Sequence, residues 1–263
     1  MFEEMYRLYQ DLDKGLQPLS VFFPHAPTAA HAKRDKARKE IGVLFSKIIQ
    51  RRKAALAAGD AEAKPTAGST SADLVQRMMD FAYADGTKLT DDEIAGMMVA
   101  TLFAAQHTSN VTATWTTLFL LDDKRRGGNY LDRVLEEMRA VEPFPGAFAS
   151  GQGIDYNVLA KQPFLYACVK EAIRMYPPII FLMRRALVDV PVGENLYVPK
   201  GSMVMVSNAV AQRLPEVFER PDEYLPDRFL ATSDSAWDIT KLPKYSFIGF
   251  GAGIHTCLGE SFA

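Results

Sequence analysis

The chain has 263 residues, of which 48% are hydrophobic and 24% are charged, and its formal net charge is −2 at pH 7. This composition is typical of a globular protein with a sizeable core, and the small net charge gives no reason to expect a nucleic acid as a partner. Two cysteines, Cys168 and Cys257, are too few for a disulfide framework and favour a reducing compartment.

Residues 1–57 follow a helical pattern that is interrupted at "PLSVFFPHAPT", residues 18–28. The opening stretch, "MFEEMYRLYQDLDKG", is acidic and amphipathic, which is typical of a helix and unlike a signal peptide. Residues 29–57 are rich in lysine and arginine. That pattern indicates a solvated helix surface or, alternatively, a face that docks on a membrane or a partner. Residues 57–71 are small and polar and predict a loop.

The longest predicted helix covers residues 90–121. Thr90 and Glu93 have the spacing of a capping box, and residues 94–121 contain no Asp, Glu, Lys or Arg. An uncharged run of this length is compatible with a transmembrane helix as one alternative. Its polar centre, "QHTSN" at 106–110, would lie at the bilayer midplane, where polar groups are costly. The pattern therefore favours a long helix buried in a large core.

The remaining elements predict a mainly α fold with a small β-sheet. A helix is expected at 162–176, where the double proline at 177–178 ends it. Apolar runs separated by "GEN" predict the strands of a small sheet over 179–208. Residues 226–263 are rich in turns.

The stretch "FIGFGAGIHTCLGE", residues 247–260, surrounds Cys257 with glycines. A cysteine thiolate can hold the iron of haem, and glycine lets a loop run close to a flat macrocycle and turn backbone N–H groups toward the sulfur. Phe250, Gly253 and Gly259 have the spacing relative to Cys257 that such a loop requires. Taken alone, the stretch favours a buried cysteine in a glycine-rich loop over a haem ligand.

A second motif pairs a carboxylate with guanidinium groups. Glu171 and Arg174 in "EAIR" lie one helical turn apart on the same face, which on an exposed helix would be an ordinary ion pair of small value. Arg228 in "PDRF" lies in a segment that could return to this pair. A carboxylate shared between two guanidinium groups would form a buried, hydrogen-bonded node.

These three motifs, in this order and spacing, resemble the cytochrome P450 family: E-x-x-R, P-x-R-F and F-x-x-G-x-x-x-C-x-G. The resemblance implies the cytochrome P450 fold, here incomplete at both ends, and haem b as cofactor. It makes Cys257 the axial ligand of the haem iron, in a loop shaped by Phe250, Gly253 and Gly259. The implied structural node behind that loop consists of Glu171, Arg174 and Arg228.

Within the family, "AAQHTS" at 104–109, "LMR" at 182–184 and His255 are similar to the sterol 14α-demethylase branch. This likeness implies that Thr108 and His107 form the catalytic pair that guides protons to oxygen, and that Arg184 and His255 pair with the haem propionates. The likeness also implies that the sterol cavity is lined by Phe103, Ala104, Phe181 and Met183. Ordinary core residues would show the same sequence pattern, so that alternative stays open for these four. Ala105 departs from the branch, which normally has glycine there.

The resemblance also implies partners and a place in the cell. The expected reaction is oxidative removal of the sterol 14α-methyl group with O2 and electrons from NADPH, which a cytochrome P450 reductase delivers. The endoplasmic reticulum membrane is the implied location, with association through a segment absent here. Residues 1–57 would be the helices that roof the cavity, and residues 226–263 the haem-loop region.

Other interpretations stay open. Because Cys257 lies close to the last residue, we expect the chain to be a fragment of a longer protein, and an inactive truncated remnant is one alternative. A monooxygenase that acts on fatty acids or xenobiotics is another. A haem-thiolate isomerase or dehydratase is disfavoured, because such an enzyme has no use for the oxygen-activating Thr108.

Overall fold

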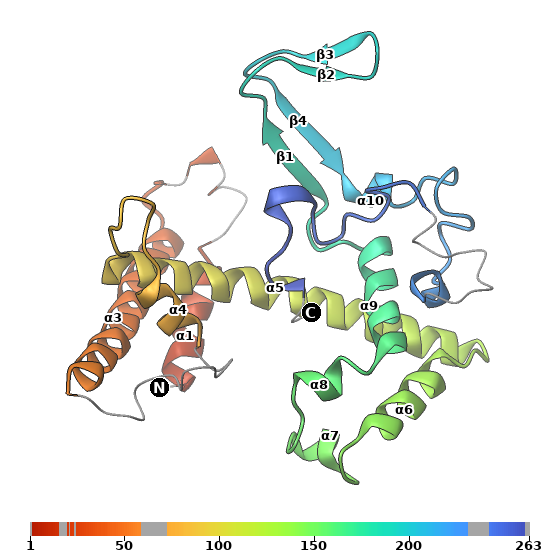
Figure 1. The fold of residues 1–263 in the computed structure, drawn as a ribbon, viewed down its shortest axis with the longest axis horizontal. Coiled ribbons are helices and arrows are strands. Elements are labelled where there is room, and N and C mark those ends of the chain that lie inside the picture. Colours follow the sequence, from red (N-terminus) through yellow and green to blue (C-terminus); the bar gives the residue numbers. More distant parts are fainter. Residues whose placement is uncertain are drawn as a thin grey trace. The chain divides into compact units, whose positions relative to one another are not determined.

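A computed structural model of the protein describes residues 2–15, 20, 22–23, 25–58, 73–230 and 242–260. The chain divides into two units, Met1–Ala104 and Ala105–Ala263, which are described separately below. The described residues are mostly helical, with four short strands confined to the second unit (Figure 1). The expected class, mainly α with a small amount of β-structure, is confirmed.

The first unit is built on two helices, α1 (Phe2–Asp13) and α3 (Ala29–Ala57), which pack against each other (Figure 1). A fully buried leucine, isoleucine or phenylalanine side chain contributes about 1.5–3 kcal/mol. The contact between α1 and α3 buries aliphatic and aromatic side chains of both helices. These are Leu8, Leu12, Ala37, Ile41 and Phe45. The unit also contains α4 (Leu74–Asp80) and the first part of α5 (Asp91–Arg125).

Side chains cap the starts of α4 and α5. Thr90 N donates to Glu93 Oε2 at 2.7 Å, and Glu93 N donates to Thr90 Oγ1 at 3.3 Å, so the predicted capping box is present at the start of α5. Asp73 caps α4 by accepting from Gln76 N at 2.9 Å. Helix α5 runs on to Arg125, four residues past the predicted end at 121 (125 − 121).

In the ranges that the structure describes, no helix combines the length and the apolar character needed to cross a membrane. The uncharged run at 94–121 therefore lies in a helix that fails this criterion.

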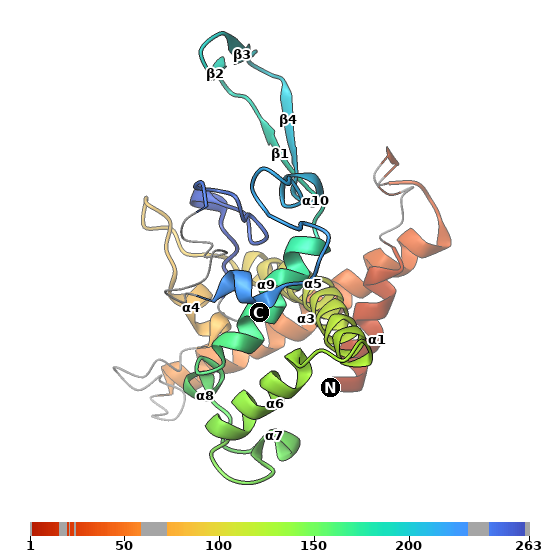
Figure 2. The same cartoon turned by 90° about the vertical axis from the view of Figure 1, so that its right-hand side faces the viewer.

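The second unit is organised around α9 (Pro163–Met175), which contacts α6 (Tyr130–Val141) and the 3-10 turn η2 (Pro226–Phe229) (Figure 2). A small core joins α5, α6 and α9 through Leu120, Val134, Phe164 and Cys168. Two short helices, α7 (Ala147–Ser150) and α8 (Tyr156–Leu159), lie between α6 and α9 in sequence.

Aromatic stacking holds α5 to the segments beside α9. Trp115 stacks on Tyr176 with ring centroids 4.1 Å apart, and Phe119 stacks on Tyr224 at 4.4 Å. Such pairs contribute about 0.5–1.5 kcal/mol beyond their buried area. This part of the unit positions α9 against α5.

The strands form two ladders in place of the single small sheet predicted over 179–208. β1 (Phe181–Arg185) pairs antiparallel with β4 (Met203–Ser207), with Met183 opposite Met205. β2 (Val190–Val192) pairs with β3 (Leu196–Val198) at the far end of this ladder, as both Figure 1 and Figure 2 show. Between the ladders, Lys200 N donates to the Asp189 side chain at 2.7 Å, and Pro199 has no N–H to donate. The backbone pairing is interrupted there.

Candidate functional site

Glu171, Arg174 and Arg228 meet in the interior of the second unit. Arg174 Nε donates to Glu171 Oε2 at 2.7 Å, and Arg174 Nη2 donates to Glu171 Oε1 at 2.9 Å. Arg228 Nε donates to the same Oε1 at 3.3 Å, so one carboxylate accepts from two guanidinium groups. Glu171 and Arg174 have 0% of their surface exposed and Arg228 has 3%. The E-x-x-R helix and the P-x-R-F turn are thereby joined.

Backbone carbonyls accept further hydrogen bonds from these guanidinium groups. Arg174 Nη1 donates to Gln212 O at 2.9 Å, Arg174 Nη2 to Glu223 O at 3.2 Å, and Arg228 Nη2 to Arg220 O at 2.8 Å. Burial lowers the pKa of the Arg228 guanidinium, while the adjacent Glu171 carboxylate acts to raise it. A buried ionic group is tolerable only when its hydrogen bonds are made, and this node makes them.

The cysteine loop closes on itself through backbone hydrogen bonds. Cys257 N donates to Phe250 O at 2.8 Å, and Gly251 N donates to Ile248 O at 2.9 Å. Gly251 has φ +77° and Gly253 has φ +71°, in the left-handed region that glycine adopts without strain. A Cβ on residue 251 would lie 3.3 Å from His255 O. A Cβ on residue 253 would have no other atom within 4 Å.

The sulfur of Cys257 lies at the surface of this loop and receives a backbone donor. Gly259 N donates to Sγ at 3.3 Å, and the Cys257 residue is exposed. Phe250, Gly253, His255 and Gly259 lie in the same loop, and His255 is exposed at the end of η4 (Gly253–His255). An N–H directed at sulfur stabilises a thiolate, which is the form that binds metal.

The loop rests on the C-terminal end of α9. A Cβ on residue 249 would overlap the Ile173 side chain, so only glycine allows this approach. Ile248 N donates to Gln212 Oε1 at 3.0 Å. The sequence motifs did not identify Gln212. The sequence does indicate that a side-chain donor is needed here, because Pro177 and Pro178 follow the helix and remove two backbone donors.

The other predicted site residues lie on separate elements. Thr108 and His107 are in α5, where Thr108 Oγ1 donates to Ala105 O at 3.4 Å. Arg184 is exposed on β1, where its Nη1 donates to Met183 O at 2.8 Å. No hydrogen bond or ion pair joins Arg184 to His255 in the described part of the chain. Their predicted shared contact with a cofactor stays a prediction.

The predicted cavity-lining residues are divided between the two units. Phe103 packs on Tyr9 in the first unit, with ring centroids 5.1 Å apart, and Ala104 follows it in α5. Phe181 and Met183 lie on β1 in the second unit, 41% and 58% exposed. A role in a common cavity stays a prediction for these four residues.

Cys168 lies in the core of the second unit and is a packing residue. It is 0% exposed, and burial raises the pKa of its thiol to about 12. A thiol protonated at neutral pH is a poor nucleophile and a poor metal ligand.

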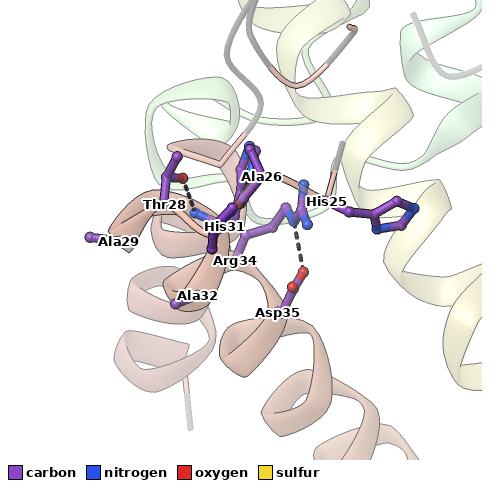
Figure 3. Close-up of a pocket in the computed structure, with 9 residues that line it drawn as sticks. His25, Ala26, Thr28, Ala29, His31, Ala32, Arg34 and Asp35 are labelled. Carbon is purple, nitrogen blue, oxygen red and sulfur yellow. Dashed lines mark hydrogen bonds and ion pairs between the residues drawn. The ribbon is translucent and has the colours of Figure 1, made fainter. Parts of the chain in front are cut away.

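Two surface hollows are lined by other residues. One of about 470 Å³ lies at the start of α3, where its polar groups hold the preceding turn (Figure 3). There His31 Nδ1 lies 2.6 Å from Ala26 O, and Arg34 Nε donates to Asp35 Oδ1 at 2.8 Å. The other, of about 330 Å³, lies beside Trp115 and Tyr176. Neither hollow contains a predicted site residue, so the candidate site is the cysteine loop with the node behind it.

Comparison with known proteins agrees with this geometry. The sequence matches the family model for cytochrome P450 over residues 1–263. It is 38% identical to obtusifoliol 14-alpha demethylase of Triticum aestivum, over 100% of this chain and 54% of that protein. It is 38% identical to sterol 14-demethylase of Arabidopsis thaliana, over 100% and 50%, and 33% identical to lanosterol 14-alpha demethylase of Bos taurus, over 99% and 47%. Among solved structures, cyanobacterial CYP120A1 bound to retinoic acid is similar with a TM-score of 0.73 and 21% identity, over 98% of this chain and 52% of that chain.

This chain belongs to the cytochrome P450 family. It spans about half the length of the curated relatives it matches. The likeness to CYP120A1, at 21% identity, supports the fold alone.

Membership of this family implies a haem held by a cysteine thiolate. The residues around Cys257 fit such a group. Its sulfur is exposed and accepts from Gly259 N, while Ile254 and Leu258 on either side are 96% and 97% exposed. Burial of such apolar side chains against a flat apolar macrocycle would be favourable.

Proposed function

We propose that the whole protein is a haem-thiolate monooxygenase that removes the 14α-methyl group of a sterol. The observation that carries this proposal is the cysteine loop, which presents an exposed sulfur with the Gly259 N–H directed at it. The relatives from wheat, Arabidopsis and cattle support the substrate class, because all three are named as sterol demethylases.

Cys257 would hold the haem iron as its thiolate, and Gly259 N–H would stabilise the negative charge on Sγ. Bound haem supplies the activation of O2 with two electrons per turnover. Phe250 and Gly253 set the path of the loop, and Ile254 and Leu258 would exclude water from the iron ligand. Arg184 and His255 would pair with the haem propionates, because charge-assisted hydrogen bonds orient such groups.

Thr108 and His107 would manage the protons of the reaction. The Thr108 hydroxyl can pass a proton from Oγ1, and a histidine ring such as that of His107 has two nitrogens that can take part in proton transfer. Ala105, whose carbonyl accepts from Thr108 Oγ1, places a methyl group in the same turn of α5. We expect that methyl group to narrow the space open to oxygen and substrate.

Phe103, Ala104, Phe181 and Met183 would line the sterol cavity. Phe181 and Met183 support this assignment, because β1 leaves them 41% and 58% exposed. Electrons would come from NADPH through a cytochrome P450 reductase, and the endoplasmic reticulum membrane is the proposed location, as inferred from the sterol demethylase relatives.

The reduced, carbon monoxide difference spectrum of the chain expressed with haem tests the proposal. The expected result is a Soret band in the position typical of thiolate-ligated haem, which Cys257→Ser abolishes and Cys168→Ser leaves in place. A sterol that shifts the Soret band on titration, where a fatty acid does not, would support the sterol branch. A band that survives Cys257→Ser would contradict the proposal, and haem-free protein would leave the inactive-remnant interpretation for this chain.

A further inference from the structure

The C-terminal end of α9 has a deficit of backbone donors. The last four carbonyls of a helix have no partner within it, and N–H groups of the following residues usually serve them. Here the helix ends at Met175 and is followed by Tyr176, Pro177 and Pro178. Tyr176 N donates to Ala172 O at 2.8 Å, but the prolines carry no N–H. The carbonyls of Ile173 and Arg174 therefore need a donor from elsewhere.

Gln212 supplies this donor from a distant part of the chain. Its Nε2 donates to Ile173 O at 3.4 Å and to Arg174 O at 3.2 Å. The neighbouring Arg213 Nη2 donates to Met175 O at 2.8 Å. All four terminal carbonyls of α9 are thereby satisfied, two of them by one side-chain amide.

The other end of the same amide holds the cysteine loop. Gln212 Oε1 accepts from Ile248 N at 3.0 Å, and Gln212 is 0% exposed. Because carbonyls only accept and an N–H only donates, these three partners fix the orientation of the amide. The backbone O of Gln212 also accepts from Arg174 Nη1 at 2.9 Å, which links the residue to the buried node.

We propose that Gln212 is a positioning residue for the thiolate loop: its amide fixes Ile248, and with it the segment that leads to Cys257, on the end of α9. The close approach of Gly249 to Ile173 is consistent with this placement, since the loop and the helix touch directly at that point. The hydrogen bonds of Gln212 join parts of the protein, so the placement of the loop does not depend on haem. Only the expected effect of Gln212 on haem ligation rests on the proposed function.

Gln212→Met tests the proposal, because methionine has a similar shape and removes both the donors and the acceptor. The matched control is Gln162→Met at the other end of α9. Gln162 is also buried, at 3% exposure, and its Oε1 has no hydrogen-bond partner among the described residues. Gln212→Glu is the second variant, since it keeps an oxygen that can accept from Ile248 N and loses the two donors.

The first readout is hydrogen exchange of the haem-free chain. We expect the Ile248 amide to exchange about tenfold faster in Gln212→Met, and close to the parent rate in Gln162→Met. In Gln212→Glu the Ile248 amide should stay nearer to the parent rate than in Gln212→Met. An unchanged Ile248 rate in Gln212→Met would overturn the proposal, whether or not the chain binds haem.

The second readout is the reduced, carbon monoxide difference spectrum. A loop displaced from α9 should lose part of the thiolate-ligated band to the band of haem without thiolate, in Gln212→Met and not in Gln162→Met. If the parent chain binds no haem while the exchange result holds, haem binding by this chain fails and the placement of the loop by Gln212 stands. If both Gln212 variants fail to fold while Gln162→Met folds, the residue is structural and the positioning role is overturned.

Discussion

The side chains of Glu171 and Arg228, 57 positions apart in the sequence, lie 3.3 Å apart between Oε1 and Nε, with both residues buried. The Glu171 carboxylate also accepts from Arg174 and from the Leu225 N–H, which donates to the same Oε1 at 2.9 Å. The helix that supports the cysteine loop is thereby joined to the turn at 226–229.

Replacing Glu171 with alanine should cost about 3–5 kcal/mol in the free energy of unfolding, because Arg174 and Arg228 would stay buried without a carboxylate. Denaturant unfolding measures this change. Asp222→Asn is the control, because Asp222 pairs with Arg213 at 3.3 Å with its side chain 80% exposed. Exposed pairs contribute about 0–1 kcal/mol. A loss at Glu171 no larger than at Asp222 would contradict the role of the node.

Gly253→Ala should weaken haem binding through backbone strain alone. Residue 253 has φ +71° and open space around a Cβ, so the added cost is the left-handed conformation, about 1–2 kcal/mol. Haem retention on dilution measures the effect. Gly193→Ala in the β2–β3 hairpin is matched, with φ +64° and nothing within 4 Å, and should leave haem retention unchanged. Equal losses in the two variants would argue against a specific role for the loop.

Glu137→Ala should destabilise the second unit by about 1–2 kcal/mol, because its carboxylate caps α9 from α6. Phe164 N donates to Oε1 at 2.8 Å and Leu165 N donates to Oε2 at 2.9 Å. Gln162, at the N-cap position, makes no side-chain cap hydrogen bond of its own. Thermal unfolding of Glu137→Ala beside the exposed neighbour Glu136→Ala is the measurement. Similar midpoints for both variants would show that the cap adds nothing.

The Cys168 thiol should make the protein less stable at alkaline pH. Burial raises its pKa from the usual 9.0 to about 12, so the unfolded chain loses this proton first as the pH rises. Between these values the unfolded state binds fewer protons than the folded state, and the free energy of unfolding therefore falls with rising pH. Burial also raises the pKa of Tyr224, whose OH donates to Cys168 O at 2.9 Å, and this adds a slope of the same sign.

Unfolding of Cys168→Ala across pH 9 to 11 should show a shallower alkaline slope than that of the parent chain, because the contribution of the Cys168 thiol is removed while that of Tyr224 stays. Cys257→Ala is the control, since Cys257 is exposed. A parent chain whose stability does not change over this range would rule out the effect.

The sequence by itself determined the features whose chemistry is local or has a fixed spacing. The capping box of Thr90 and Glu93 lies within one turn, and the Glu171–Arg174 spacing places both side chains on one helix face whatever surrounds them. The glycine pattern around Cys257 indicates a loop with left-handed backbone, and Gly251 and Gly253 have that conformation. These local requirements are imposed by covalent geometry, so they can be read without the fold.

Only the tertiary structure decided which distant side chains donate to backbone carbonyls that have no local hydrogen-bond donor. The double proline after α9 shows that two carbonyls need donors, yet any of several side chains could supply them, and the fold assigns the task to Gln212, 38 positions away from Arg174. The small sheet predicted over 179–208 likewise divides into two ladders, because Lys200 N–H bonds a side chain instead of a strand. A hydrogen-bond deficit is a property of sequence, but its partner depends on which segments pack together, and that is settled by burial of the whole chain.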